Sequence, residues 1–254
     1  MTERPLILLS NDDGVGAAGL LALREALLEI GQVVTVAPER EQSGNSHSIT
    51  LDRPLRHRRV ADDLHAVDGT PVDCIYVALH HETILPRRPS IVVSGINHGP
   101  NLGNDIFYSG TVAAAREGAL RGLPAMAFSL CGRGEFREPA RLASSLVERL
   151  LAVPTHKGHA PLLNVNVPAG QVRGIRSTRL GQRHYEDGVA SRLDPRGREY
   201  YWIGGPSGAS HPPIEGTDTE AVDSGYVSIT PLILEATERG HMDLAAAMAA
   251  GSET

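Results

Sequence analysis

Two adjacent carboxylates, Asp12 and Asp13, follow a short apolar run near the start of the chain. The run, residues 6–9, is wholly apolar and bounded by turn residues, which is typical of a strand buried on both faces. Two neighbouring acids repel each other unless a proton or a cation lies between them. Hard divalent cations such as Mg²⁺ or Mn²⁺ prefer oxygen ligands. The pair is therefore predicted to bind a divalent metal at the carboxyl end of a strand, where open α/β sheets bind their ligands.

A segment rich in glycine and asparagine, residues 95–111, follows a second apolar strand predicted over residues 90–94. Glycines let a backbone approach a ligand closely, and long loops are usually functional. Asn97, at the end of the strand, can point a neutral amide oxygen at a metal. Ser109, Gly110 and Thr111 precede a predicted helix, so their hydroxyl and N–H groups are predicted to hold a phosphate.

The glycines Gly14, Gly16 and Gly19 also match the fingerprint of dinucleotide-binding proteins, and Glu39 lies at the distance expected for a ribose-binding acid. This pattern leaves an NAD(P)-binding oxidoreductase as the alternative function. The two aspartates argue against it, because they would repel a pyrophosphate at the helix N-terminus. The simpler interpretation of the glycines is a tight turn and close helix packing.

The spacing of apolar residues predicts the elements that must position these side chains. A helix over residues 20–30 and a strand over 33–37 continue the first strand as a βαβ unit, which indicates an α/β fold with a doubly wound parallel sheet. The polar loop 38–50 then leaves the same edge of the sheet as the aspartates; its simpler interpretation is a solvated loop, with His47 exposed or hydrogen-bonded. Further elements are expected as a helix from Pro71 capped by Thr70, a strand over 123–130, a helix over 137–152 and a strand over 162–167.

The last third of the chain differs in character. Residues 173–213 are rich in Arg, Gly, Tyr and His, and predict a hairpin arm outside the main sheet, with strands near 175–180 and 199–203. Residues 225–232 alternate apolar and hydroxyl side chains, which predicts a strand with one exposed face. We expect residues 1–172 to form the core that carries the metal site, and residues 173–254 to form the arm, a returning strand and a C-terminal helix that serve oligomerisation.

The amino-acid composition limits the classes of molecule that the protein is expected to bind. The 254 residues are 41% hydrophobic, enough for a large core, but only 4% aromatic, with a net charge of −6. The absence of a basic footprint and the few aromatics argue against a nucleic acid polymer as partner. The two cysteines lie far apart, and no stretch of the sequence has the features of a signal peptide or a membrane span, so the expected location is the cytoplasm.

Five motifs together resemble the stationary-phase survival protein E family, in order and along nearly the whole chain. They are NDDG at 11–14, PEREQSG at 38–44, SGIN at 94–97, YSGTV at 108–112 and GYVSITPL at 225–232. The resemblance implies metal-dependent phosphatases of nucleoside monophosphates, the 5′/3′-nucleotidases, some of which also cleave short polyphosphate. It further implies a Rossmann-like sheet with a projecting hairpin and a swapped C-terminal region, assembled as homodimers or homotetramers.

Carried onto this sequence, the family's metal ligands fall on Asp12, Asp13, Ser43 and Asn97. Asn101 and residues 109–111 then fall in the phosphate pocket. The expected activity is that of a 5′-nucleotidase in which one Mg²⁺ or Mn²⁺ activates a water that attacks phosphorus. Asp12, Asp13 and Asn101 are the expected catalytic residues, with Asn101 stabilising the phosphoryl oxygens.

Overall fold

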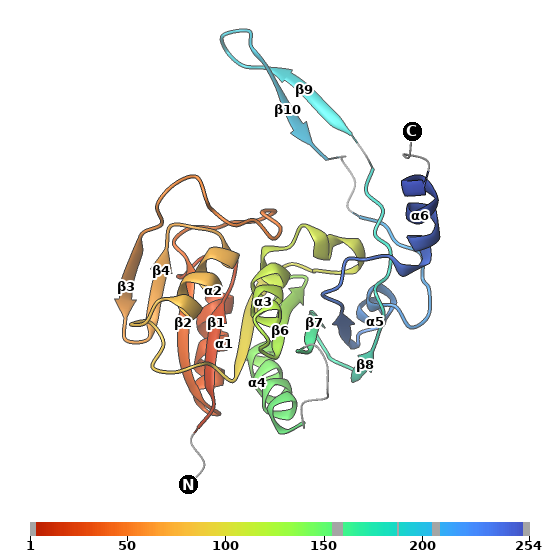
Figure 1. Cartoon of the computed structure of the whole chain (residues 1–254). Coiled ribbons are helices and arrows are strands. Elements are labelled where there is room, and N and C mark those ends of the chain that lie inside the picture. Colours follow the sequence, from red (N-terminus) through yellow and green to blue (C-terminus); the bar gives the residue numbers. More distant parts are fainter. Residues whose placement is uncertain (1–3, 154–159, 187, 205–208, 251–254) are drawn as a thin grey trace.

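A nine-stranded sheet forms the centre of the protein, seen in a computed structural model that describes residues 4–153, 160–186, 188–204 and 209–250 (Figure 1). The strand order is β3-β4-β2-β1-β5-β6-β7-β11-β8. Pairings from β4 to β7 are parallel, whereas β3 pairs antiparallel with β4 and β11 antiparallel with β7. The mostly parallel α/β sheet predicted from the sequence is thereby confirmed. Its strands are β1 (Leu6–Ser10), β2 (Gln32–Pro38), β3 (His57–Ala61), β4 (Leu64–Val67), β5 (Ile91–His98), β6 (Ala125–Cys131), β7 (Leu162–Pro168), β8 (Ile175–Ser177) and β11 (Val227–Leu232).

Helices cover both faces of the sheet. On one face α1 (Ala18–Leu28) and α4 (Arg137–Ala152) pack on a core cluster that includes Ile7 and Leu9 of β1. On the other face α2 (Pro71–His80) and α3 (Gly110–Leu120) pack on a cluster that includes Leu6 and Leu8. Successive side chains of a strand point to opposite faces. This is why the wholly apolar run 6–9 forms the central strand, in which all four residues are buried.

The start of α2 has the predicted cap. The Thr70 hydroxyl accepts a hydrogen bond from the Asp73 backbone N–H (3.1 Å), and the Asp73 carboxylate accepts one from the Thr70 N–H (2.8 Å). Asp73 also accepts from the N–H of Thr50 (2.8 Å). The cap therefore anchors the end of loop 38–50 as well as the helix.

The C-terminal part contains two differences from the sequence predictions. The segment expected as a strand over 175–180 is shorter, β8, and joins the main sheet. The hairpin instead pairs β9 (Val189–Leu193) with β10 (Glu199–Ile203) as a separate two-stranded sheet, which confirms the arm. It projects away from the rest of the molecule (Figure 1).

The second difference is β11, where the expected exposed face is wrong. Ser228 and Thr230 are buried, because β11 lies between β7 and β8 and packs against α5 (Asp218–Asp223). The hydroxyl of Thr230 is paired with that of Thr178 (2.7 Å), so at this position the polar side chain reflects an internal hydrogen bond and not contact with solvent. Two short 3₁₀ turns, η1 (Gly103–Phe107) and η2 (Arg239–His241), and α6 (Met242–Ala250) complete the described elements. Across the described ranges, none of the helices has the length and apolar character that crossing a bilayer needs.

Candidate metal and phosphate site

A cleft of about 400 Å³ lies at the carboxyl ends of the parallel strands. Its walls come from the turn after β1, the loop after β2, the end of β5 and the segment that leads into α3. All four predicted metal ligands line this cleft, as do Asn101 and Ser109. The lining residues are Asp12, Asp13, Glu41, Ser43, Gly44, Asn97, His98, Pro100, Asn101, Asp105, Tyr108 and Ser109.

Asp12 is held by the first turn of α3. The Thr111 hydroxyl donates a hydrogen bond to Asp12 Oδ1 (2.5 Å), and the Thr111 backbone N–H also donates to this carboxylate. Gly110 packs directly on Asp12, since a Cβ added there would lie 2.8 Å from the Asp12 Cβ. Gly110 and Thr111, which were predicted for the phosphate pocket, thus contact Asp12 and do not line the cleft, whereas Ser109 does.

The other predicted ligands are tied to the same place by short contacts. Asp13 Oδ2 accepts from the backbone N–H of His98 (3.2 Å). The Gln42 N–H donates to the Asp12 carbonyl (2.8 Å), which brings the following Ser43 to the cleft. Asn97 Nδ2 donates to the Gly99 carbonyl (2.8 Å), so the amide oxygen is the atom left for a ligand. Three segments distant in sequence therefore meet at one point.

The electrostatics of the carboxylate pair suit a bound cation. Burial raises the pKa of Asp12 to about 6 in spite of the Thr111 hydrogen bond, and the charge of Asp13 adds to the rise. Burial also raises the pKa of Asp13, and the nearby charge of Glu41 adds to it. The His98 N–H and ring oppose the shift at Asp13, but the net effect at both carboxylates disfavours the charged form, and a divalent cation would reverse it.

The donor set favours a hard cation. Ser43 and Asn97 add neutral oxygens to the two carboxylates, and oxygen ligands suit Mg²⁺ or Mn²⁺. Within the described ranges no cluster of three or more His, Cys, Asp or Glu side chains has the arrangement of a metal site. That finding is compatible with this ligand set, because only two of its members are of those types. The residues present therefore fit a divalent metal.

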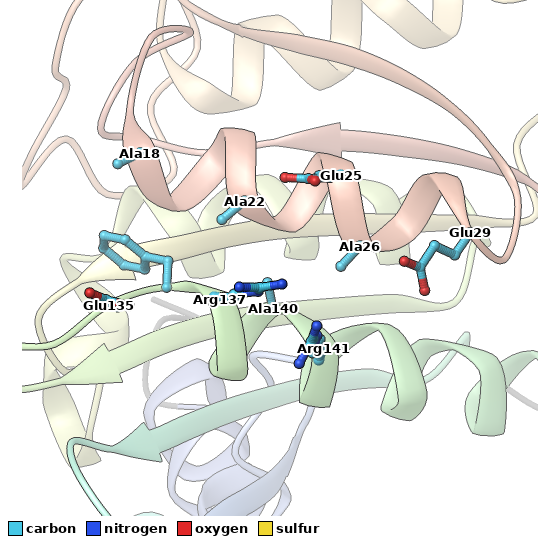
Figure 2. A pocket seen from close by; sticks show the side chains of 10 residues that line it. Ala18, Ala22, Glu25, Ala26, Glu29, Glu135, Arg137, Ala140 and Arg141 are labelled. Atoms are coloured by element: carbon cyan, nitrogen blue, oxygen red, sulfur yellow. The ribbon is translucent and has the colours of Figure 1, made fainter.

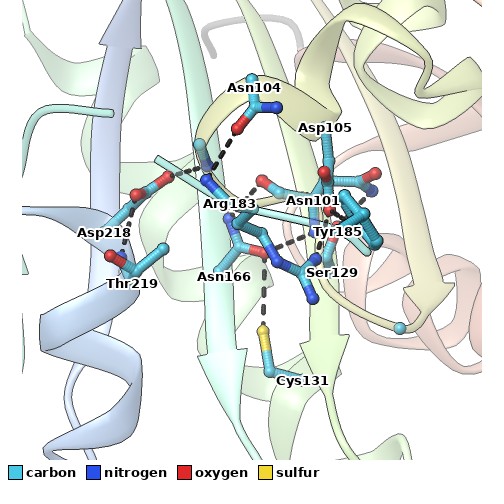
Figure 3. Close-up of polar contacts among 12 residues, drawn as sticks. Asn101, Asn104, Asp105, Ser129, Cys131, Asn166, Arg183, Tyr185, Asp218 and Thr219 are labelled. Atoms are coloured by element: carbon cyan, nitrogen blue, oxygen red, sulfur yellow. Dashed lines mark hydrogen bonds and ion pairs between the residues drawn. The ribbon is translucent and has the colours of Figure 1, made fainter. Parts of the chain in front are cut away.

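Asn101 is immobilised by polar side chains of β6 and β7 (Figure 3). Its backbone N–H donates to Asn166 Oδ1 (2.9 Å), and its carbonyl accepts from Asn166 Nδ2 (3.0 Å). Its side-chain Nδ2 donates to the Ser129 hydroxyl (2.7 Å). Buried polar groups in a sheet are costly unless each finds a partner. The strands thus hold Asn101 in one orientation at the cleft.

The segment after Asn101 is also bound to the base of the arm. Asp105 accepts hydrogen bonds from Arg183 and from the Tyr185 hydroxyl (2.7 Å), while Asn104 Oδ1 accepts from the Arg183 N–H (2.7 Å). Asp218 accepts from the N–H of Gly103 (2.9 Å) (Figure 3). One wall of the cleft is therefore fixed by the chain that leads to β9.

Six lining residues were not predicted from the sequence: Glu41, Gly44, His98, Pro100, Asp105 and Tyr108. Each is a close neighbour of a residue that was predicted, and proximity to Ser43, Asn97 or Ser109 is the only signal that could have found them. The prediction for His47 is confirmed, because its Nε2 lies 3.1 Å from Glu117 Oε2.

Two of the three fingerprint glycines have structural roles. Gly14 closes the turn after β1 with φ of +102°, and the Asn11 side chain bonds both its N–H (3.3 Å) and its carbonyl (3.0 Å). A Cβ on Gly19 would lie 2.1 Å from the Ile96 carbonyl oxygen, so only glycine lets α1 approach β5 this closely. By contrast, a Cβ on Gly16 would meet no atom within 4 Å. The simpler interpretation, a tight turn with close helix packing, is confirmed for Gly14 and Gly19.

A larger pocket, about 640 Å³, lies between α1 and α4 (Figure 2). Small alanines and charged side chains such as Glu25, Glu29, Arg137 and Arg141 line it, and none of the predicted site residues does. This pocket is larger than the carboxylate cleft, but it lacks the convergent oxygens of the predicted metal ligands that line the cleft.

Comparisons with known proteins agree with this geometry. The chain matches the family described as survival protein SurE over residues 7–187. It is 54% identical to the 5′-nucleotidase SurE of Sorangium cellulosum, over 97% of this chain and 96% of that protein. It is 48% identical to the 5′-nucleotidase SurE of Vibrio vulnificus, over 92% of each. The crystal structure of the SurE protein from Aquifex aeolicus has a TM-score of 0.83 and 42% identity, covering 96% of this chain and 100% of that one. The chain therefore belongs to the SurE survival protein family.

Proposed function

We propose that this chain is a metal-dependent phosphomonoesterase, a 5′-nucleotidase that hydrolyses nucleoside monophosphates to nucleoside and phosphate. The observation that carries the proposal is the convergence of Asp12, Asp13, Ser43 and Asn97 on one cleft beside Asn101. The names of the Sorangium and Vibrio relatives support the same activity. Neither of these relatives is named as an oxidoreductase. Two of the fingerprint glycines that suggested an NAD(P) site have other roles, Gly14 in a turn and Gly19 in close packing.

In this proposal Asp12, Asp13, Ser43 and Asn97 hold one Mg²⁺ or Mn²⁺. When bound, the cation supplies Lewis-acid chemistry to the phosphoryl group and the attacking water. Thr111 and Gly110 orient Asp12 by direct contact, and the His98 N–H orients Asp13.

The chain's own donors then position the ester. Asn101 and Ser109 line the cleft and donate hydrogen bonds to the phosphoryl oxygens, where negative charge concentrates in phosphoryl transfer. The oxygen of a water attacks phosphorus opposite the ester oxygen, and the phosphorus–ester oxygen bond breaks. One proton of the water ends on the departing oxygen, which leaves as the alcohol of the nucleoside, and the other stays with the phosphate. Because these contacts involve only the phosphate, 3′-nucleotides and short polyphosphates are included as substrates.

The proposed assembly is a homodimer or homotetramer. The arm exposes Trp202 and Ile203 on β10 and Leu193 on β9. An isolated two-stranded hairpin is marginally stable in water, so these side chains suit a contact with a second copy. We propose residues 173–254 as the oligomerising part, with its C-terminal segment exchanged between subunits, and residues 1–172 as the catalytic core. The proposed location is the cytoplasm, where Cys74 and Cys131, which are both free, stay reduced.

The experiment is phosphate release from AMP with Mg²⁺ or Mn²⁺, compared between the wild-type chain and Asp12→Asn. We expect the substitution to abolish metal-stimulated release while the circular dichroism spectrum and unfolding midpoint stay close to wild type. Asp62→Asn is the matched control, since the Asp62 side chain is exposed and pairs only with Arg59 outside the cleft. Full activity in Asp12→Asn, or release by the wild-type chain that survives a chelator, contradicts the proposal.

A further inference from the structure

Tyr108 presents an exposed aromatic ring at the rim of the cleft. The residue lines the cleft and is 68% exposed, next to Ser109 at the start of α3. The chain contains only ten Phe, Tyr and Trp residues, and large aromatic side chains gain more than most from burial. A ring left in water beside a phosphate pocket is therefore well suited to contact a ligand.

The backbone that carries this ring is fixed from both sides. The Tyr108 N–H donates to the Asp105 carbonyl (2.9 Å), and the Tyr108 carbonyl accepts from the Ser46 N–H (3.1 Å). Ser46 belongs to the loop that carries Ser43, and Ser109 caps α3 through the Val112 N–H (3.1 Å). The backbone of Tyr108 thus has a fixed position relative to the predicted metal ligands and the predicted phosphate pocket, and this backbone holds the ring at the rim of the cleft.

The wall beside Tyr108 suits an uncharged group. Asp105 lines the same cleft, and its carboxylate is paired with Arg183 and with the Tyr185 hydroxyl (2.7 Å) (Figure 3). The remaining carboxylates of the cleft, on Asp12, Asp13 and Glu41, belong to the predicted metal end. The cleft therefore has a charged end for a phosphate and an aromatic end for a neutral ring.

We infer that Tyr108 is a specificity-determining residue whose ring stacks on the nucleobase of the substrate while Asn101 and Ser109 hold the phosphate. This inference rests on the proposed function and names which part of a nucleotide the cleft recognises beyond the phosphate. Stacking tolerates any base, since every base has a π-face. The enzyme therefore accepts purine and pyrimidine nucleotides, and distinguishes both from phosphate esters that lack a base.

The experiment compares AMP with ribose 5-phosphate, which has the same sugar and phosphate but no base. kcat and KM are measured for the wild-type chain, Tyr108→Ala, Tyr108→Phe and Phe107→Ala. Loss of base stacking lowers affinity by about tenfold. We expect Tyr108→Ala to raise KM for AMP by about that factor with kcat little changed, and to leave ribose 5-phosphate unaffected. Tyr108→Phe keeps the ring and retains the wild-type KM.

Phe107→Ala is the matched control, because Phe107 is a neighbouring ring that is 62% exposed and does not line the cleft. We expect it to behave as wild type. Equal losses on both esters in Tyr108→Ala, or an unchanged KM for AMP, contradict the base subsite. So does a change of mass by light scattering in Tyr108→Ala, which would place the ring in an interface between subunits. A wild-type chain that hydrolyses neither ester contradicts the proposed function itself.

Discussion

Asp12 illustrates how a single residue can depend on its neighbours for its function. Its burial disfavours the charged form, and the Thr111 hydroxyl and N–H oppose that effect by donating to the carboxylate. Loss of a residue that holds a metal ligand in this way typically weakens metal affinity by about 10- to 100-fold. Thr111, which does not line the cleft, is thus expected to affect metal binding at the proposed site through Asp12.

Replacing Thr111 by valine tests this dependence. Thr111→Val keeps the shape of the buried side chain but removes the hydroxyl donor, so Asp12 loses one of its hydrogen bonds. Loss of such a partner weakens metal binding by about tenfold or more. We expect the Mn²⁺ concentration that gives half-maximal phosphate release from AMP to rise by that factor. Thr111→Ser retains the donor and serves as the control; an unchanged metal requirement in Thr111→Val contradicts this role.

The roles of individual residues could be predicted from the sequence only where the residues belong to a recognisable motif. Asp12, Asp13 and Asn97 stand at the ends of apolar strands, so their position at the sheet edge follows from the parallel topology. Ser43 came from the family resemblance alone, because a serine in a polar loop has no distinguishing pattern. Asp105 and Tyr108 could not be singled out, since what defines them is contact with Arg183, Tyr185 and the open cleft.

At the scale of elements, close packing between α1 and β5 positions the site. Gly19 lies against the Ile96 carbonyl, one residue before Asn97, so the helix and the ligand-bearing strand end are in direct contact. The same three glycines that match the dinucleotide fingerprint thus differ in what they do, with Gly14 in a turn, Gly19 in an interface and Gly16 beside open space.

The different surroundings of Gly19 and Gly16 predict different effects of an alanine at each position. A Cβ at Gly19 forces α1 and β5 apart, and such overpacking costs about 1 to 3 kcal/mol. Gly16→Ala meets no atom and leaves the free energy of unfolding nearly unchanged, with at most a small gain of about 0.4 to 1 kcal/mol from reduced freedom of the unfolded chain. Urea unfolding of the two variants measures both effects. Equal stability of Gly19→Ala and Gly16→Ala would show that the close approach is not required.

Elements whose neighbours are close in sequence were predicted well, and those with distant neighbours were not. The helix caps and the run 6–9 depend on local patterns, and each appears in the structure as expected. The environment of β11 depends on β7 and β8, so its alternation could not reveal that Ser228 and Thr230 are buried. Likewise β8 lies in a polar stretch that resembles the arm but pairs with the main sheet.

At the scale of the whole molecule, the arm that we propose for assembly forms a sheet separate from the one that carries the cleft. Its strands form their own small sheet, yet the chain at its base contacts the cleft wall through Arg183 and Tyr185. Large apolar side chains exposed on such an arm are unfavourable in a monomer and favourable in an interface.

The double substitution Trp202→Ser and Ile203→Ser tests the proposed assembly. Removing both side chains from β10 deprives the interface of its apolar contacts, so we expect light scattering to report a smaller species than for the wild-type chain. Leu51→Ser is the control, because Leu51 is 85% exposed but lies outside the arm. A mass equal to that of the wild-type assembly would mean that the arm does not hold the subunits together.

The proposed activity depends on one divalent cation bound where three segments meet. Anomalous diffraction from crystals soaked in Mn²⁺ measures this most directly. We expect a single strong anomalous peak in the cleft, in contact with side-chain oxygens of Asp12, Asp13, Ser43 and Asn97, and we expect this peak to be lost in Asp12→Asn. The absence of an anomalous peak from the cleft in crystals of an active preparation would contradict the proposed metal site. So would a peak that lies only elsewhere on the chain.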